Sequence, residues 1–190
     1  MSHMSDKKEE ALKLAKITSV DILEEKKSLH DILLACKTIC KYLGIVEKNE
    51  WIDLELNGYL TKYKTRDQLD HNLPPYRKTT WMFYDLYGNK VSLPTDIVEL
   101  FGESSIYQSI REIETSNSLT IGSPFLDKFN EFIAKYGIDY ASKNLKIHEA
   151  RIQNGEIRKI LDGVKNRIHE LLDNLIFNSS MSFSDCDYHD

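Results

Sequence analysis

The fold of this chain is organised around the stretch Trp51-Ile52-Asp53-Leu54-Glu55-Leu56-Asn57-Gly58-Tyr59. Trp51 and Leu54 share one face of a helix because they lie three residues apart, and other apolar residues fill a neighbouring face. Gly58 has no Cβ, so it can adopt the backbone conformation that ends a helix. The stretch therefore predicts a short helix over 49–57, with Tyr59 folding back on its last turn.

A longer helix is predicted upstream, between Ser28 and Gly44. Ser28 is a favourable N-cap, Asp31 occupies the capping-box position three residues later, and Gly44 is a typical C-terminal stop. The apolar residues between them recur at helical spacing and are Leu29, Ile32, Leu33, Cys36, Ile39, Cys40 and Leu43. This pattern predicts a core helix.

Both ends of the chain are predicted to be disordered. Residues 1–16 are largely polar, and their opening Met-Ser-His-Met is typical of a cloning remnant. Residues 178–190 are rich in serine and acidic residues. A short helix is predicted after the first segment from apolar residues spaced three apart, which are Ile17, Val20 and Leu23. The sequence thus predicts a single domain over 17–177.

The middle of the chain changes from helical to extended patterning. Residues 60–73 are polar and predict a loop, and Pro74-Pro75 cannot continue a helix. Over 76–87 the side chains alternate with a period of two, which predicts a strand. Gly88-Asn89 is a tight-turn pair, so residues 90–93 are expected to pair back as a hairpin.

The remaining chain alternates helices with short strands. The expected elements are a helical turn over 94–101, a helix capped by Ser104 or Ser105, a strand over 119–121, a helix from Ser123 to Tyr136 and an edge strand over 144–152. In the last helix, Asn154 can act as the cap, and apolar residues from Ile157 to Leu175 fall on one face. The predicted class is α+β, a mainly helical domain packed around a small antiparallel sheet or hairpin.

Composition narrows the function. A net charge of −5 argues against general polyanion binding, which needs a clustered positive surface. The apolar runs are too short to span a membrane, and no signal peptide is visible. Three cysteines without a disulfide framework favour a reducing compartment, so we expect a cytoplasmic protein.

Three candidate chemical motifs carry little weight. Cys36 and Cys40 lie within an aliphatic stripe, where free cysteine behaves as a small hydrophobe. Arg66 and His71 resemble the RNase motif of HEPN proteins, but Pro74-Pro75 follows so closely that we expect a solvated loop and no helix. Residues 185–190 include metal-ligand types, yet ordering a terminal segment costs entropy. We predict no metal and no cofactor.

The polar face of the last helix offers a further candidate. It combines a carboxylate, an amide and two cations within two turns, which are Asp162, Lys165, Asn166 and Arg167. Such a set could bind a phosphate or a partner's carboxylate through the planar fork of the arginine. It is equally compatible with a solvated face laced by i,i+4 pairs such as Asp162–Asn166.

Three sequence blocks occur in a fixed order, and they are Trp51-x-x-x-Glu55-Leu56-Asn57-Gly58-Tyr59, Leu73-Pro74-x-Tyr76-Arg77 and Ile160-Leu161-Asp162-Gly163-Val164-Lys165-Asn166-Arg167. In this order the chain resembles the AbiTii domain family of bacterial abortive-infection proteins over roughly residues 17–177. Two departures are a longer, more charged segment after Tyr59 and Lys165 where arginine is common. The resemblance implies a role in antiphage defence as a toxin or effector module, and it supplies no catalytic residue set.

The blocks mark one polar patch as the expected functional surface, consisting of Glu55, Asn57, Tyr59, Tyr76, Arg77, Asp162, Asn166 and Arg167. Under the first hypothesis, the protein is a defence effector or sensor module that self-assembles as a homo-oligomer or binds a defence-system partner. No membrane partner is expected.

Two alternatives stay open. The chain could be a nuclease or nucleotide-processing enzyme in which Glu55 is the base and Arg77 or Arg167 clamps phosphate. The net charge does not support such a nucleic-acid or nucleotide ligand. Otherwise it is a non-catalytic oligomerisation or interaction module, in which Asn57 and Arg77 would be buried and hydrogen-bonded, as buried polar groups are.

Overall fold

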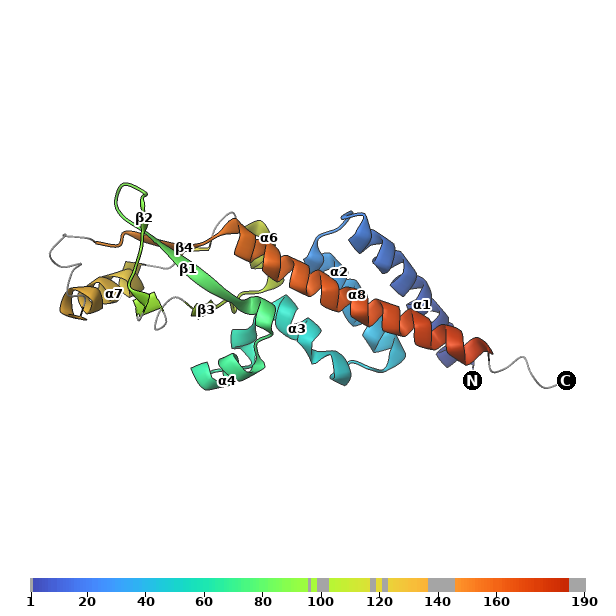
Figure 1. Ribbon diagram of the computed structural model, residues 1–190. Helices are drawn as coiled ribbons and strands as arrows, with labels where there is room; N and C mark the ends of the chain where they lie inside the picture. The colour runs from blue at the N-terminus through green and yellow to red at the C-terminus, as the bar shows by residue number, and fades with distance from the viewer. Residues whose placement is uncertain are drawn as a thin grey trace. The chain divides into compact units, whose positions relative to one another are not determined.

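The computed structural model describes residues 2–95, 97–98, 103–116, 119–120, 123–136 and 146–184 (Figure 1). The chain divides into two compact units, and the predicted domain over 17–177 includes parts of both. The first unit comprises Met1–Asn72, Tyr107–Thr115 and Ile160–Asp190, and the second comprises Leu73–Ile106 and Ser116–Lys159. The described elements are mainly helical, with a small antiparallel sheet, which confirms the predicted α+β class.

The first unit begins with α1 (Ser2–Leu23), which packs beside α2 (Leu29–Leu43) (Figure 1). Helix α1 corrects the prediction of disorder over 1–16, because residues 2–16 are helical. Its buried face carries the small side chains Ala11, Ala15 and Thr18, followed at helical spacing by Ile22. Small side chains let two helices approach closely, so a packing face of this kind is inconspicuous in a polar sequence.

Helix α2 has the ends that its sequence predicts. Ser28 Oγ accepts a hydrogen bond from the Asp31 backbone N–H at 3.1 Å. Gly44 follows the helix at φ 70°, and its N–H donates to the carbonyls of Cys40 and Lys41. The predicted apolar stripe is buried at Leu29, Ile32, Leu33, Cys36, Ile39 and Cys40. Local capping chemistry and one apolar face are thus sufficient to define this helix.

The central stretch forms the predicted short helix. Residues 47–72 form four elements. These are η1 (Glu47–Asn49), α3 (Glu50–Asn57), η2 (Tyr59–Thr61) and α4 (Arg66–Asn72), where η denotes a 3₁₀ turn. The loop predicted over 60–73 is therefore wrong where α4 stands. Leu69 is the buried residue of α4, and Thr65 Oγ1 accepts a hydrogen bond from the Gln68 N–H at 3.3 Å. One buried leucine and one cap support a helix of about two turns inside a polar segment.

Two further helices complete the first unit, α6 (Ile110–Thr115) and the part of α8 (Asn154–Ser184) from Ile160 onward. Between residues 160 and 172, helix α8 buries one residue in each turn, at Ile160, Val164, Ile168 and Leu172. It continues through Ser184, so residues 178–184 of the predicted disordered tail are helical, and 185–190 lie outside the described residues. Extending an existing helix is easier than nucleating one, which is why polar residues can continue it.

The second unit contains the sheet, whose strands are β1 (Lys78–Tyr84), β2 (Lys90–Val91), β3 (Glu103–Ser105) and β4 (Glu149–Ile152). β1 pairs antiparallel with each of the other three. The predicted hairpin is confirmed, with Phe83 opposite Val91 and Gly88 at φ 79°. Asp85 Oδ1 stabilises the turn by accepting hydrogen bonds from the N–H groups of Tyr87 at 2.9 Å and Asn89 at 2.8 Å.

Several predicted boundaries move in the structure. Ser104 and Ser105 lie in β3 and do not cap a helix, which corrects that prediction. The strand expected over 144–152 narrows to β4, and Thr120 from the strand expected over 119–121 forms an isolated bridge to Arg151. A short apolar or β-branched run is compatible with either a strand or the start of a helix. Whether it forms a strand depends on a neighbouring strand with which it can pair.

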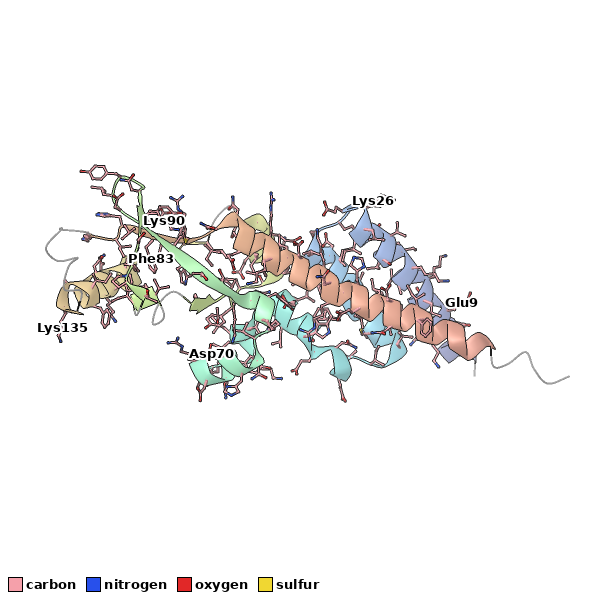
Figure 2. The ribbon with its side chains drawn as sticks, viewed as in Figure 1. Glu9, Lys26, Asp70, Phe83, Lys90 and Lys135 are labelled. Carbon is pink, nitrogen blue, oxygen red and sulfur yellow. The ribbon has the colours of Figure 1, made fainter. Side chains whose placement is uncertain are left out.

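The core of the second unit lies between the sheet and α7 (Ser123–Tyr136), the helix predicted from Ser123. Phe83, labelled on β1 in Figure 2, stacks on Phe129 with ring centroids 5.0 Å apart. The Asn130 side chain also exchanges two hydrogen bonds with the backbone of Ile147, each 2.8 Å long. These contacts fix α7 to the chain that leads into β4.

Three predictions fall partly outside the described residues. The helical turn expected over 94–101 includes 96 and 99–101, and the strand and edge-strand predictions include 121 and 144–145. None of the described helices combines the length and the apolar character needed to cross a membrane.

Candidate functional site

Glu55 and Tyr59 form a buried hydrogen-bonded pair at the end of α3. The Tyr59 hydroxyl donates to Glu55 Oε1 at 2.7 Å, and the two residues are 1% and 0% exposed. Tyr59 folds back on the last helical turn, as the sequence predicts. A buried carboxyl is costly unless it is hydrogen-bonded, so this bond holds Glu55 inside the protein.

Gly58 lets this helix end meet another backbone segment of the first unit. The Gly58 N–H donates to the Leu54 carbonyl at 2.9 Å, and the Tyr59 N–H donates to the Tyr107 carbonyl at 2.9 Å. Gly58 has φ 82° and ψ 151°, a conformation open almost only to glycine. A Cβ there would lie 2.9 Å from the Tyr107 oxygen and 3.3 Å from the Ser109 nitrogen. The glycine is therefore required both by its dihedral angles and by its neighbours.

Arg77 has a structural position in the second unit. Its side chain is 0% exposed, and Nη1 donates to the Ile106 carbonyl at 3.2 Å. The Ile106 N–H donates in return to the Arg77 carbonyl at 3.0 Å. Arg77 therefore connects the start of β1 to the end of β3 by hydrogen bonds. The neighbouring Tyr76 is half-buried.

The other predicted patch residues lie in the first unit and differ in exposure. Asn57, Asp162 and Asn166 are exposed and are called the exposed trio below. The Asn57 side chain donates back to the Asp53 carbonyl at 2.9 Å. The Arg167 guanidinium lies over the Trp51 ring at 4.4 Å, in cation–π geometry. Among the eight predicted patch residues, Glu55 and Tyr59 are hydrogen-bonded to each other. Arg167 contacts the stretch 51–59 through the ring of Trp51.

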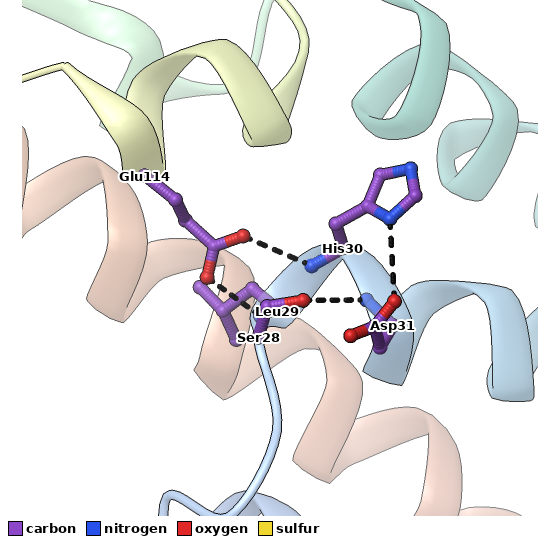
Figure 3. Close-up of polar contacts among 5 residues, drawn as sticks. All are labelled: Ser28, Leu29, His30, Asp31 and Glu114. Atoms are coloured by element: carbon purple, nitrogen blue, oxygen red, sulfur yellow. Dashed lines mark hydrogen bonds and ion pairs between the residues drawn. The ribbon is translucent and has the colours of Figure 1, made fainter.

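The N-terminus of α2 receives a partner that sequence reasoning missed. Glu114 of α6 accepts hydrogen bonds from the backbone N–H groups of Leu29 at 2.6 Å and His30 at 3.1 Å (Figure 3). Ser28 Oγ accepts from the next N–H, that of Asp31. A carboxylate at a helix N-terminus is favourable for both hydrogen bonding and the helix dipole. No local spacing in the sequence could identify Glu114 as this cap.

The start of α6 has a capping box that the sequence did contain. Ser109 donates its N–H and its hydroxyl to Glu112 Oε2, at 2.8 Å and 2.7 Å. These bonds hold the pKa of the Glu112 carboxyl below its usual value. Ser109-x-x-Glu112 is the ordinary S-x-x-E signature. Ser104 and Ser105 are N-cap residue types too, so N-cap preference alone does not single out Ser109 as the cap of this helix.

Cys36 and Cys40 are buried as apolar members of α2. Burial raises the pKa of the Cys36 thiol to about 12 and that of Cys40 to about 11. Thiolate formation is therefore disfavoured at neutral pH. Within the described part of the chain, no group of three or more His, Cys, Asp or Glu side chains is placed to hold a metal.

Arg66 and His71 stand on α4, so the reason given against their motif, the absence of a helix, is wrong. Residues five apart are separated by about 140° around a helix. Arg66 Nε lies 3.6 Å from Asp70 Oδ2, and His71 Nδ1 lies 3.0 Å from the Asp67 carbonyl oxygen. Both side chains are exposed and make local contacts, so the geometry does not join them in one site.

The protein is a mainly helical α+β protein, and the stretch 51–59 contains a buried hydrogen-bonded pair, Glu55 and Tyr59. The AbiTii family model matches residues 17–184, most of the chain. The chain belongs to the AbiTii family, which confirms the resemblance found in the sequence blocks. No curated protein and no solved structure matches it.

Proposed function

We propose that this protein serves in abortive-infection defence against phage as an effector or sensor module that acts through protein contacts. Membership of the AbiTii family supports the defence role, because the family name refers to abortive infection. In this proposal the protein works in the cytoplasm, on a partner from the same defence system or on a second copy of itself.

The single observation that favours contacts over catalysis is the burial of Glu55 and Arg77. A general base must come within about 2.6–3.2 Å of the proton it removes, directly or through one water. Glu55 is fully buried and bonded to Tyr59, and Arg77 is fully buried and bonded to the Ile106 carbonyl. Neither side chain is accessible for the base and phosphate-clamp roles of the nuclease alternative.

The exposed trio is the part of the patch that a partner can reach. Asn57 and Asn166 each offer donors and an acceptor, and Asp162 offers acceptors only. Asp162 and Asn166 are four residues apart on α8, so they stand on one helix face. This face presents a short polar site suited to hydrogen-bonding a protein surface.

A phage-plating assay with paired α8 variants tests the proposal. We expect expression of the parent chain to lower plating efficiency or arrest growth, and D162A/N166A to abolish this effect while keeping its helical circular dichroism. The matched control is E170A/N174A, which removes an exposed acid and an exposed amide with the same spacing on the same helix. A parent chain without effect, or equal loss in both double variants, would contradict the proposal.

The catalytic alternative is tested separately on the purified protein. We expect RNA, DNA and nucleotides to stay intact with and without divalent metal ions. Cleavage that persists through purification and disappears in R167A, which removes the half-buried phosphate clamp of the nuclease alternative, would show a nuclease and would overturn the contact-based proposal.

A further inference from the structure

The outer face of α1 carries an apolar stripe that is exposed. Its residues are Ile17, Val20 and Leu23, with exposures of 47%, 48% and 69%. Spacing of three places them side by side along the helix. The opposite face of α1, with Ala11 and Ala15, already packs against α2. Helix α1 therefore has one apolar face inside its unit and a second facing solvent, and neighbouring exposed apolar residues mark interaction surfaces.

The charges beside the stripe are arranged with opposite signs at its two ends. Lys16 lies at the N-terminal end, and Glu24 lies just past the C-terminal end. Both are exposed, and Glu24 forms an ion pair with Lys26, itself exposed. Asp21, the other acidic residue in this turn, pairs with Lys27 at 2.7 Å. An occupant with the reversed order of charges, acidic opposite Lys16 and basic opposite Glu24, would complement the two ends of the stripe.

We propose that the outer face of α1 is a self-association surface on which a second copy of α1 packs antiparallel. A twofold axis through Val20 places Ile17 of one copy opposite Leu23 of the other. The same axis brings Lys16 of each copy opposite Glu24 of its neighbour. A parallel arrangement would instead put lysine beside lysine and glutamate beside glutamate. The stripe thus pairs apolar with apolar residues and lysine with glutamate, as a self-complementary twofold interface requires.

The proposed contact between two α1 helices is small, and its flanking charges remain exposed to solvent. A standard stable interface uses roughly 20–30 residues a side, many more than the stripe and its flanking charges. The dimer is therefore concentration-dependent and weakens with salt, because its ion pairs are exposed. The surface does not include the exposed trio, so its failure would leave the defence proposal standing.

Analytical ultracentrifugation of the full chain across the micromolar range measures the association. We expect a monomer–dimer equilibrium for the parent, and a roughly hundredfold weaker dimer in V20E, which sets two carboxylates on the twofold axis. The matched control is L60E, since Leu60 is an exposed leucine, at 54%, on a different element of the same unit. L60E is expected to dimerise like the parent. A parent chain that stays monomeric, or equal losses in both variants, would overturn the proposal.

Charge exchange tests the antiparallel register. K16E and E24K each place like charges together, so each is expected to dimerise roughly tenfold more weakly than the parent. An equimolar mixture of K16E and E24K is expected to form a heterodimer, because every facing pair is then opposite in charge. The double variant K16E/E24K is expected to recover self-association. A mixture and a double variant that both remain as weak as the singles would exclude this register.

Discussion

The end of α3 and the outer face of α1 reverse the usual rule of burial. At the end of α3 the carboxyl of Glu55 is fully buried, whereas on α1 the apolar side chain of Leu23 is 69% exposed. Buried polar groups and exposed apolar patches are the informative exceptions in a soluble protein. The first exception is explained internally by the hydrogen bond from Tyr59. The exposed apolar side chains of α1 have no such explanation among the described residues, so we attribute their exposure to binding of a partner.

The largest predicted loss of stability comes from substituting Gly58 at the end of α3. G58A would have an unfavourable positive φ and a Cβ only 2.9 Å from the Tyr107 oxygen. We expect it to lower the free energy of unfolding by about 3 kcal/mol or more, measured by urea denaturation. The control is G44A, which has φ 70° but no neighbour within 4 Å of the added Cβ. Its expected cost is only about 1 kcal/mol. Equal costs would show that contact with Tyr107 is unimportant.

The second prediction compares the two regions directly. Y59F removes the donor to the buried Glu55 and is expected to cost about 1.5 kcal/mol of unfolding free energy. V20S replaces an exposed apolar side chain on α1 and is expected to change the stability of the monomer by less than about 0.5 kcal/mol. Denaturation at low protein concentration measures both. A larger loss of unfolding free energy in V20S than in Y59F would contradict the view that the α3 end stabilises the fold and that the outer face of α1 does not.

The third prediction concerns the remote cap on α2. E114A removes the carboxylate that accepts from the N–H groups of Leu29 and His30, and we expect a loss of about 1 kcal/mol. S28A removes the neighbouring local cap and is expected to cost a similar amount. Because both caps serve one helix start, the double variant is expected to deviate from additivity. Strict additivity would indicate that the two caps act independently.

The smallest expected effect is the pH dependence of the α6 capping box. Hydrogen bonds from Ser109 lower the pKa of Glu112 below its ordinary value of 4.5. A lowered pKa in the folded state adds stability above pH 4.5, and this contribution is lost as the pH falls through the folded value. E112Q should therefore differ from the parent at pH 7 and approach it in more acidic solution. A difference that is constant with pH would contradict this origin.

Much of the helical framework could be predicted from short patterns. The ends of α2 at Ser28 and Gly44 and the hairpin turn at Gly88-Asn89 were predicted correctly, because each depends on residues within one turn. The first half of α1 and all of α4 were missed, since their packing faces contain few large apolar residues. The functional patch was predicted as a set of residues, and the structure separates its buried members from its exposed ones.

By itself, the sequence determined the class of the fold, the local caps and turns, and the family to which the chain belongs. These features depend on backbone dihedral preferences and hydrogen bonds between near neighbours, which a short segment already contains. Only the tertiary structure decided that Glu55 is buried, that Glu114 caps a helix 85 residues away and that Gly58 touches Tyr107. Burial and long-range contacts depend on how distant segments pack together. The exposed stripe on α1 belongs to this second group, because its spacing predicted a helix but only packing showed which face points to solvent.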